Sequence, residues 1–433
     1  MTRWIYPAPV EIPASWTDLH LPPLVAETLV RRGIDTPEAA WAFLHPDSLP
    51  YTPFPGVAKA VEIINAAIHN QETIGVWGDF DVDGQTSTTV LVQTLQALGT
   101  NVVYYIPIRG KESHGIHIDT LKPMLDNGVK LLLTCDTGVT AYEAIDYANS
   151  RGVDVIITDH HELGPKLPNA RVILNPKLLP QGHVLENLAG VGVAFKLAEA
   201  LLIGNQKSEI ANLLDLVALG LIADVAILHG ETRSLAQRGI QVLRNTGRIG
   251  LRAMAELSGT SLESLTEESI GFSFAPRLNA LGRLGDANPA VELLLSHDPS
   301  RARVLAAQIE GLNAQRRLLT NQVYEAAEAQ LRENPELGNE PALILCSQNW
   351  PGGVVGIVAN KLVERYRKPA ILLNQSEDGI LRGSARSVEG LNITEAITTQ
   401  KHLLIGFGGH PMAAGLALPF DQLGNFRKGL GKK

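Results

Sequence analysis

Short apolar runs alternate with amphipathic segments over the first half of the chain. The apolar runs are Thr73–Trp77, Val102–Ile106, Val129–Cys135 and Val153–Thr158. Segments with helical spacing of apolar residues cover about 86–98 and 142–150. Strands that alternate with helices are typical of a parallel sheet with helices on both faces, so we expect an α/β fold.

The second half is more helical and then returns to an α/β pattern. Residues 192–228 have a mostly helical pattern and residues 235–257 are amphipathic. Residues 301–332 are polar, with apolar residues at helical spacing and Gly311 as their only Pro or Gly, which predicts one long helix bridging two domains. Strands over Ala342–Cys346 and Pro369–Leu373, with a helix over Val355–Tyr366 between them, predict a smaller second α/β domain.

The first 55 residues are rich in Pro and Trp and predict a short helical extension that ends in a loop at Pro50, Pro53 and Pro55. The pattern divides the chain into four parts. We expect an N-terminal extension over 1–55, a main α/β domain over 56–232, a helical connector over 233–335 and a second α/β domain over 336–433.

Composition narrows the class of protein. The chain has 433 residues, 45% of them hydrophobic and 19% charged, as in ordinary globular proteins. Without an apolar run of about 18 residues or a signal-peptide core, neither a membrane span nor secretion is expected. The two cysteines, Cys135 and Cys346, define neither a disulfide framework nor a zinc site, so we expect a cytoplasmic protein.

The net charge of -8 argues mildly against a purely electrostatic DNA-binding surface. Carboxylates that bind divalent cations would lower the formal charge, and the bound cations would restore part of it. Aromatic residues make up only 5% of the chain, which does not favour base stacking as the main source of affinity. The sequence has no G-x-x-x-x-G-K-[ST] element, so ATP-driven unwinding is not expected.

Three carboxylates, Asp79, Asp81 and Asp83, directly follow the first apolar run. Their spacing would place them on one side of an extended segment, where a divalent cation is the simplest way to neutralise them. A solvated acidic loop and an EF-hand are the alternatives. An EF-hand needs a Glu at loop position 12, which Val90 occupies here.

Other acidic residues follow other apolar segments: Asp136, then Asp159 with His160 and His161, then Asp224. Each could by itself be a helix cap or a structural histidine. Four such sites together are better explained by metal binding at the carboxyl edge of a sheet. Carboxylate oxygens combined with imidazole nitrogen suit manganese, magnesium or zinc.

These four segments resemble the motifs of the DHH phosphoesterase superfamily in order and approximate spacing. The matching segments are Gly78–Thr88, Asp136–Gly138, Asp159–His161 and Ile222–Asp224. The flanking segments resemble the RecJ exonucleases within that superfamily. They are Ile106–Arg109, Glu112–Gly115, Leu188–Leu197 and Phe274–Leu284. Towards the C-terminus, Trp350–Val358, Gly383–Ser387 and Gly408–Pro411 resemble a DHHA1 domain, so the likeness runs from about Val57 to Leu418.

The resemblance implies a parallel-sheet DHH domain joined by a long helix to a smaller DHHA1 domain, with the active site in the cleft between them. It implies a single-stranded-DNA-specific exonuclease that uses two divalent metal ions, Mn²⁺ or Mg²⁺, and releases 5′-mononucleotides from the 5′ end in DNA repair and recombination. Single-stranded DNA is the implied partner, together with single-stranded-DNA-binding protein and a recombination helicase. We expect a monomer.

The resemblance also implies roles for particular residues. The implied metal ligands are Asp79, Asp81, Asp83, Asp136, His160 and Asp224. Asp136 would bridge the two metals, Asp159 would orient a neighbouring ligand, and His161 would contact the scissile phosphate or assist the leaving group.

Substrate contacts are implied for a further set of residues. They are Arg109, Arg277, Asn279, Arg283, Ser384, Arg386, Gly408, Gly409 and His410. For each arginine a surface salt bridge is the alternative. Arg277 and Arg283 flank Asn279 in what we interpret as a Gly- and Ala-rich loop, and Gly408–His410 is interpreted as an anion-binding loop.

The sequence departs from the family in places. Pro351 stands where RecJ proteins usually carry His, and Trp77 stands where family II pyrophosphatases carry a metal-binding His. We therefore expect either that Asp79 helps to hold the first metal or that this metal binds weakly. Most RecJ proteins continue into an OB-like domain, which is not present in this sequence. The rival hypotheses are another DHH enzyme, acting on oligoribonucleotides or small nucleotides, and a replication scaffold without activity.

Overall fold

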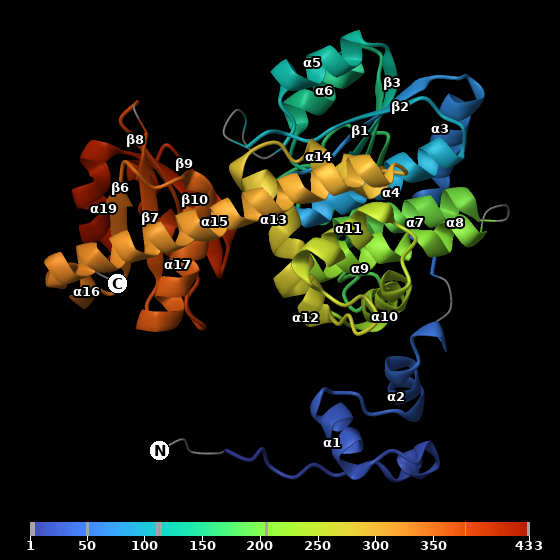
Figure 1. Ribbon diagram of the computed structural model, residues 1–433, viewed down its shortest axis with the longest axis horizontal. Helices are drawn as coiled ribbons and strands as arrows, with labels where there is room; N and C mark the ends of the chain where they lie inside the picture. The colour runs from blue at the N-terminus through green and yellow to red at the C-terminus, as the bar shows by residue number, and fades with distance from the viewer. Residues whose placement is uncertain are drawn as a thin grey trace. The chain divides into compact units, whose positions relative to one another are not determined.

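The computed structural model describes residues 5–48, 52–109, 112, 115–203, 207–376 and 378–430. It divides into two compact units, Met1–Glu310 and Gly311–Lys433. Each has its own sheet (Figure 1). The finer four-part division of the chain stays a prediction.

The sheet of the first unit has five parallel strands in the order β2-β1-β3-β4-β5. The strands are β1 Thr73–Trp77, β2 Val102–Tyr105, β3 Val129–Cys135, β4 Asp154–Thr158 and β5 Val172–Leu174. Ile74, Val76 and Leu132 are fully buried, as expected for strands covered on both faces. The four predicted strands are confirmed. β5 is an additional strand of only three residues, too short for a pattern to reveal it.

Helices cover both faces of this sheet. One face is covered by α3 Val57–His69, α4 Val82–Ala97 and α7 Gly190–Leu202, and the other by α5 Ile118–Asp126 and α6 Tyr142–Ser150. The prediction of a covered parallel sheet is therefore confirmed. α4 begins four residues before the predicted Thr86, because Asp81 caps it by accepting a hydrogen bond from the Gly84 amide.

Further helices complete the first unit. They are α8 Lys207–Asn212, α9 Leu214–Ala223, α10 Gly230–Arg244, α11 Ile249–Ser258, α12 Glu267–Ser269, the π-helix η4 Ile270–Phe274, α13 Ala275–Leu284 and α14 Asn288–Leu295. Of these, α9, α13 and α14 pack against α4. The amphipathic stretch 235–257 is two helices, α10 and α11, since Thr246 and Arg248 turn away to bind the buried Asp215 carboxylate. The prediction of a loop around Arg277 to Arg283 is wrong, because these residues form helix α13.

The N-terminal extension is helical, as predicted. It comprises η1 Ala14–Leu19, α1 Pro23–Arg31, α2 Pro37–Leu44 and η2 Pro46–Ser48, built around a small core of Trp16, Ala26, Leu29 and Ala40. Pro53 and Pro55 lie in the turn before α3, and the predicted loop residue Pro50 lies outside the described residues. A 3-10 turn, η3 Pro176–Leu178, follows β5.

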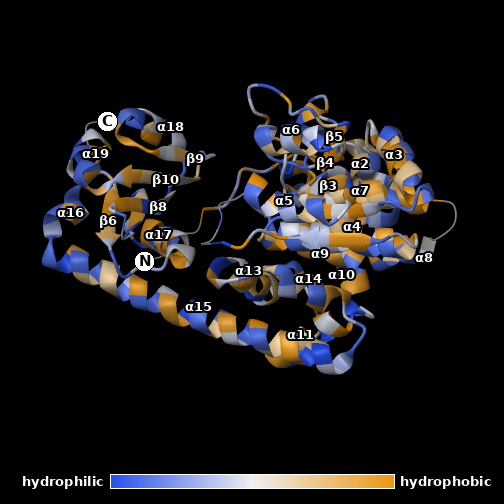
Figure 2. Ribbon diagram, turned by 90° about the horizontal axis from the view of Figure 1, so that it is seen from above, coloured by the Kyte–Doolittle hydropathy of each residue, from blue (hydrophilic) through white to orange (hydrophobic). Residues whose placement is uncertain are grey.

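Helix α15, Pro299–Glu333, runs from the first unit into the second, which confirms the predicted long bridging helix. Figure 2 shows hydrophilic and hydrophobic residues alternating along its length. Within the second unit it packs Val323, Ala327 and Leu331 against the core.

The sheet of the second unit is mixed, with the strand order β6-β7-β8-β10-β9. The strands are β6 Leu343–Ser347, β7 Ala370–Gln375, β8 Ile380–Arg386, β9 Gly406–His410 and β10 Ala413–Pro419. Only β6 and β7 pair in parallel. The interpretation of Gly408–His410 as a loop is wrong, because these residues belong to the edge strand β9.

Helices cover both faces of this second sheet as well. α17 Gly352–Tyr366 packs on one face, and α18 Ile393–Thr398 and α19 Leu423–Leu430 lie on the other. The remaining elements are α16 Pro335–Asn339, η5 Lys401–Leu403 and η6 Phe420–Gln422. No helix in the described part of the chain combines the length and the apolar character needed to cross a membrane.

Close packing of α10 on α9 generates the first prediction. A Cβ added at Gly239 would overlap the Leu214 carbonyl oxygen and lie 2.7 Å from Ala218 Cβ. Gly239→Ala should therefore lower the free energy of unfolding by about 1–3 kcal/mol, measured by urea denaturation. Gly311→Ala is the control, since a Cβ there meets nothing within 4 Å. A fall in stability for Gly311→Ala but not for Gly239→Ala would contradict the described packing of α10 on α9.

Candidate metal centre

The four acidic segments predicted from the sequence meet at one place in the first unit. Asp79 follows β1, Asp136 follows β3 and Asp159 follows β4, so all three lie at the carboxyl edge of the parallel sheet. Asp224 arrives from a different element, the C-terminal end of helix α9, and not from a strand.

The first acidic segment is not extended throughout, which corrects the prediction. Asp81 is the N-cap of α4 and Asp83 lies in the first turn of that helix. Both oxygens of Asp83 accept backbone hydrogen bonds, from Gly190 N at 2.6 Å and Val191 N at 2.8 Å. The N-terminus of α7 therefore fixes this carboxylate, and its dipole favours the negative charge.

Two glycines permit the close approach of helices to these carboxylates. A Cβ at Gly190 would lie 2.7 Å from Asp136 Cβ and Oδ1, and one at Gly220 of α9 would lie 2.9 Å from Asp83 Oδ1. Sequence reasoning matched Leu188–Leu197 to the family but assigned it no role. A Gly at the first position of an apolar helix that points at an acidic cluster is the signal that could have indicated one.

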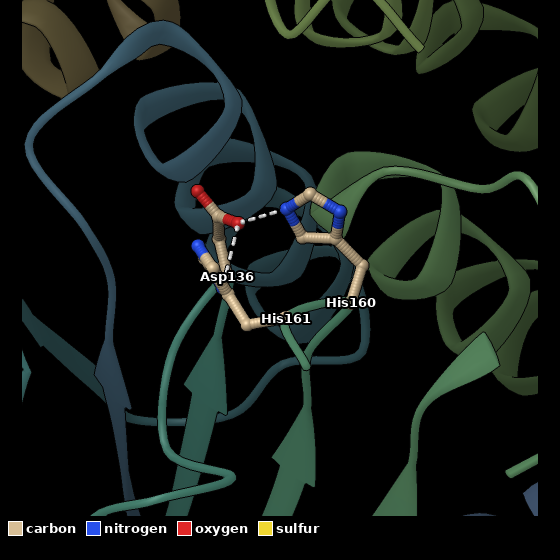
Figure 3. Close-up of side chains that lie close together, drawn as sticks. All are labelled: Asp136, His160 and His161. Atoms are coloured by element: carbon tan, nitrogen blue, oxygen red, sulfur yellow. Dashed lines mark ion pairs between the residues drawn. The ribbon is translucent and has the colours of Figure 1, made fainter. Parts of the chain in front are cut away.

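Asp136 is the centre of the cluster. It is buried and has a positive φ of 59°, a conformation that costs energy for most non-glycine residues. His160 Nε2 lies 3.1 Å and His161 Nδ1 3.9 Å from Asp136 Oδ1 (Figure 3). Both histidines therefore converge on one carboxylate oxygen.

Three overlapping groups of side chains bring one possible ligand atom each to within 4.8 Å of one another. The groups are Asp79 with Asp81 and Asp136, Asp83 with His160 and Asp224, and Asp136 with His160 and His161. Asp136 and His160 each belong to two groups. All six predicted metal ligands are thus brought together, and Asp136 and His160 are the two residues through which the groups overlap.

The side chains alone leave excess negative charge in this site. Burial, reinforced by Asp83 and Asp81, raises the pKa of Asp136 well above its usual value. Burial and the same two neighbours raise the pKa of Asp224 to about 8. Burial, then Asp79 and Asp83, raises the pKa of Asp81 to about 6. A nearby cation would favour the ionised form of all three carboxylates, and Asp136 and Asp224 depend on it most.

Two further features fit a divalent cation. Asp224 caps the C-terminal end of α9, where the helix dipole disfavours a carboxylate. Asp136 Oδ1 is buried without a hydrogen bond of good geometry from any described residue. Carboxylate oxygens with an imidazole are the donor set that manganese and magnesium accept, so the residues present fit these metals.

Asp159 holds the loop that carries the two histidines. It accepts hydrogen bonds from the backbone amides of Val139, His160 and His161, and its Oδ1 lies 2.8 Å from His161 Nδ1. Burial lowers the pKa of His161, but the hydrogen bond and charge of Asp159 outweigh burial and raise it to about 9. Burial lowers the pKa of His160. The two adjacent histidines are therefore in different electrostatic states.

Arg109 lies beside the acidic turn. Its Cζ is 4.0 Å from the centre of the Phe80 ring, and its Nε donates a 2.8 Å hydrogen bond to the Gly282 carbonyl of α13. Gln85 strengthens the same junction, because its Nε2 donates to both Phe80 O and Leu278 O. Helix α13 is thereby attached to the first acidic segment, a link that sequence reasoning missed.

The other candidate contacts on α13 differ in their surroundings. Arg277 Nε donates to Glu310 Oε2 at 2.5 Å and its Nη1 donates to Ser273 O at 2.8 Å, so the salt-bridge alternative describes it here. Asn279 and Arg283 are partly buried on the same helix. Ser113 and His114, from the family-like segment after Arg109, lie outside the described residues.

In the second unit, the candidate contacts lie on one part of the sheet. Arg386 of β8 and His410 of β9 both pair with Ala413 of the intervening strand β10. Ser384 and Gly408 both pair with Gly415 in the same way. Gly409 lies between Gly408 and His410 on β9, which is exposed.

Helix α17 passes close to this group. A Cβ at Gly356 would lie 2.9 Å from Arg386 Nη2 and 3.2 Å from Ser384 Oγ. Burial lowers the pKa of the Arg386 guanidinium, whose Nη1 donates to Ala385 O. Ser384, Arg386, Gly408 and His410 thus form a second constellation, within the second unit.

The structure shows where the two residues that depart from the family pattern, Trp77 and Pro351, lie. Trp77 is fully buried at the end of β1, where its indole packs against Tyr105. Pro351 is the N-cap of α17 and directly precedes its first turn. Neither residue supplies a metal ligand. Asp79, two residues after Trp77, belongs to one of the groups of side chains that could hold a metal ion.

Fold and site together define a class of protein. Residues 73–221 match the DHH family, N-terminal domain, and residues 339–432 match the DHHA1 domain. A chain with both domains and an intact acidic centre is a DHH-type protein.

Comparison with individual proteins shows to which branch of the DHH proteins this chain belongs. The chain is 45% identical to the single-stranded-DNA-specific exonuclease RecJ of Bacillus subtilis, over 95% of this chain and 52% of that protein. It is 36% identical to RecJ of Escherichia coli, over 95% of this chain and 75% of that protein. It superimposes on the crystal structure of Thermus thermophilus RecJ in complex with Mn²⁺ with a TM-score of 0.83 at 32% identity, covering 96% of this chain and 59% of that one. The chain belongs to the RecJ family and spans about half the length of the Bacillus relative.

The raised pKa values generate the second prediction. Because burial and neighbouring carboxylates raise the pKa of Asp224 to about 8 and that of Asp136 well above its usual value, binding of Mn²⁺ at pH 7 should release at least about one proton. Affinity should consequently rise between pH 7 and 9 and fall towards pH 6. Calorimetry at pH 7 in two buffers of different ionisation enthalpy measures the proton count.

Asp224→Asn is the control for this measurement, because it removes the titrating carboxyl while keeping the shape of the side chain. It should release fewer protons than the parent protein. A binding enthalpy that is the same in both buffers would contradict the proposed ionisation state.

Proposed function

We propose that this chain is a metal-dependent exonuclease that hydrolyses single-stranded DNA from its 5′ end and releases 5′-mononucleotides. The observation that carries the proposal is the convergence of six predicted metal ligands into overlapping groups around Asp136, in a chain of the RecJ family. The relatives named above are single-stranded-DNA-specific exonucleases, which supports the choice of substrate.

Two divalent ions, Mn²⁺ or Mg²⁺, are the proposed cofactors, and RecJ of Thermus thermophilus has been crystallised with each of them. Asp79, Asp81 and Asp136 would hold one ion, and Asp83, His160 and Asp224 the other. Such a pair supplies an activated water and stabilises the attacking and leaving oxygens of an in-line displacement at phosphorus.

The remaining residues of the centre are Asp159, which would orient a metal ligand, and His161, which would donate a hydrogen bond or a proton. Asp159 binds the backbone on both sides of His160 and so fixes the orientation of that ligand, a task that is typical of second-layer carboxylates. Burial lowers the pKa of His161, whereas its hydrogen bond to Asp159 raises it and so favours the protonated imidazole. His161 is therefore suited to donate a hydrogen bond to the scissile phosphate or a proton to the leaving oxygen.

Phosphate binding is assigned to residues of both units. Arg109, held between Phe80 and α13, is the best-placed guanidinium beside the acidic turn. Ser384, Arg386, Gly408, Gly409 and His410 would bind phosphate from the second unit, and Arg277, Asn279 and Arg283 from α13. Arg277 would first have to leave Glu310, so we rank it below Arg109.

The biological setting is part of the same proposal. Roles in DNA repair and recombination, partnership with single-stranded-DNA-binding protein and a recombination helicase, a monomeric state and a cytoplasmic location follow from the family.

The third prediction concerns Asp136. Asp136→Ala and Asp136→Asn should each lower the nuclease rate by at least about 10²-fold, since even indirect partners of a metal cost 10–100-fold. Asn tolerates the positive φ that Ala disfavours, so Asp136→Asn separates loss of the ligand from backbone strain. Rates are measured with labelled single-stranded DNA and Mn²⁺, and circular dichroism checks the fold.

Asp126→Ala is a matched control, because Asp126 is an exposed carboxylate that pairs only with Arg151 among the described residues. It should retain the parent rate. Unchanged nuclease activity of Asp136→Asn would refute the assignment of the metal centre.

The fourth prediction separates the exonuclease from its rival within the superfamily. With Mn²⁺, a 5′-phosphorylated single strand of about 20–40 deoxynucleotides should be degraded stepwise to mononucleotides, while its duplex form should resist. Thin-layer chromatography of a 5′-labelled strand identifies the first product. Activity confined to di- and trinucleotides, or to RNA, would instead favour a small-nucleotide phosphodiesterase.

A further inference from the structure

A basic cavity lies within the first unit, between the N-terminal extension and helix α10. Its volume is about 260 Å³. Arg32 and Phe43 line it from the extension, and His229, Gly230 and Arg233 line it from the start of α10. None of the described residues that line it carries a carboxylate. The cavity is distinct from the acidic centre, which is lined by aspartates.

Two guanidinium groups meet at this cavity over one aromatic ring. Arg233 Cζ lies 3.7 Å and Arg32 Cζ 5.9 Å from the centre of the Phe43 ring. Neither arginine forms an ion pair with any residue that the structure describes. Burial lowers the pKa of Arg233, and the nearby charge of Arg32 lowers it further, more than Glu267 counteracts.

The start of helix α10 adds positive potential to the same place. The helix has 15 residues, and its N-cap residue, His229, makes no side-chain hydrogen bond to the first turn. Amide N–H groups at such a helix end, together with two guanidinium forks, favour a tetrahedral anion with several acceptor oxygens.

The contacts that attach the extension to α10 account for Arg233 but not for the charge of Arg32. Ser234 Oγ donates to Pro46 O at 2.5 Å, and Arg238 Nε lies 3.4 Å from Asp47 Oδ1. Arg233 Nε also donates to Phe43 O at 3.5 Å. Among the described residues, the Arg32 guanidinium has one such contact, with the Phe43 ring, which belongs to the extension itself and does not tie it to α10.

We propose that Arg32, Arg233, His229 and the start of α10 form a phosphate-binding site outside the metal centre. Its ligand is the phosphate group, supplied either by the backbone of a bound DNA strand or by free inorganic phosphate.

The strand is the favoured source. His229 follows the candidate metal ligand Asp224 by five residues, so their Cα atoms are at most about 18 Å apart. A strand that reaches the metal centre would need only a few further nucleotides to reach the cavity. This preference rests on the proposed function, whereas the phosphate site itself does not.

The test measures binding without cleavage. Fluorescence anisotropy in EDTA gives the affinity for a labelled oligothymidylate of about 20 nucleotides at several salt concentrations. Arg32→Ala should weaken binding about threefold to tenfold at 50 mM salt and reduce the slope of log affinity against log salt by about 0.7, the value for one lost single-strand phosphate contact. Arg32→Lys, which keeps the charge, should retain most of that slope.

Arg151→Ala is the matched control, because Arg151 is an exposed arginine that also lies over an aromatic ring, 5.8 Å from the centre of Tyr147. It should bind like the parent protein. A second arm measures the rise in the thermal midpoint caused by sodium phosphate, which Arg32→Ala should reduce and Arg151→Ala should not.

The outcomes are distinct. A reduced salt slope supports a site for the strand, and a reduced phosphate effect with an unchanged slope supports a site for free phosphate. If Arg32→Ala changes neither, the proposal is overturned. Hydrolysis with Mn²⁺ is scored separately, so a chain that failed to cut DNA would sink the proposed function while the phosphate arm still tested the cavity.

Discussion

Mutual repulsion among buried carboxylates is the constraint around which the first unit is organised. Asp83 and Asp136 are each buried, and their charges act on one another. The fold offers only partial compensation. The N-terminus of α7 neutralises part of the charge of Asp83, whereas Asp136 receives no such help from its own loop and Asp224 lies at the unfavourable end of α9. Divalent cations would supply the positive charge that the described residues lack.

The surrounding elements can be understood as supports for that arrangement. Gly190 and Gly220 allow α7 and α9 to approach the carboxylates closely, and Asp159 ties the histidine loop to the strand ends. Gln85 and Arg109 extend the support to α13, so the acidic turn and the candidate phosphate contacts on that helix form one packed junction. Such a rigid surrounding is what a metal centre needs to hold its ligands in position.

Most of the architecture could be predicted from local pattern, because buried parallel strands are apolar runs of ordinary length. The exceptions have physical causes. β5 is too short for periodicity to show, and α13 was mistaken for a loop because Gly and Ala serve there for close packing, with Gly282 lying against Phe80. Gly408 to His410 form a strand for a related reason, since pairing with β10 outweighs the weak strand preference of Gly. The ligand residues could be predicted from their place after apolar runs. The amide donors of Gly190 and Val191 are harder to predict, because every residue type except Pro carries a backbone N–H and only the Gly at position 190 indicates a close approach.

The central claim is that the acidic cluster holds two divalent ions around Asp136. It is tested most directly by anomalous diffraction from crystals of this chain grown with Mn²⁺. The account predicts two manganese peaks, one in contact with Asp79, Asp81 and Asp136 and the other in contact with Asp83, His160 and Asp224. Absence of manganese from this cluster at saturating concentration, or peaks bound by other residues, would contradict it.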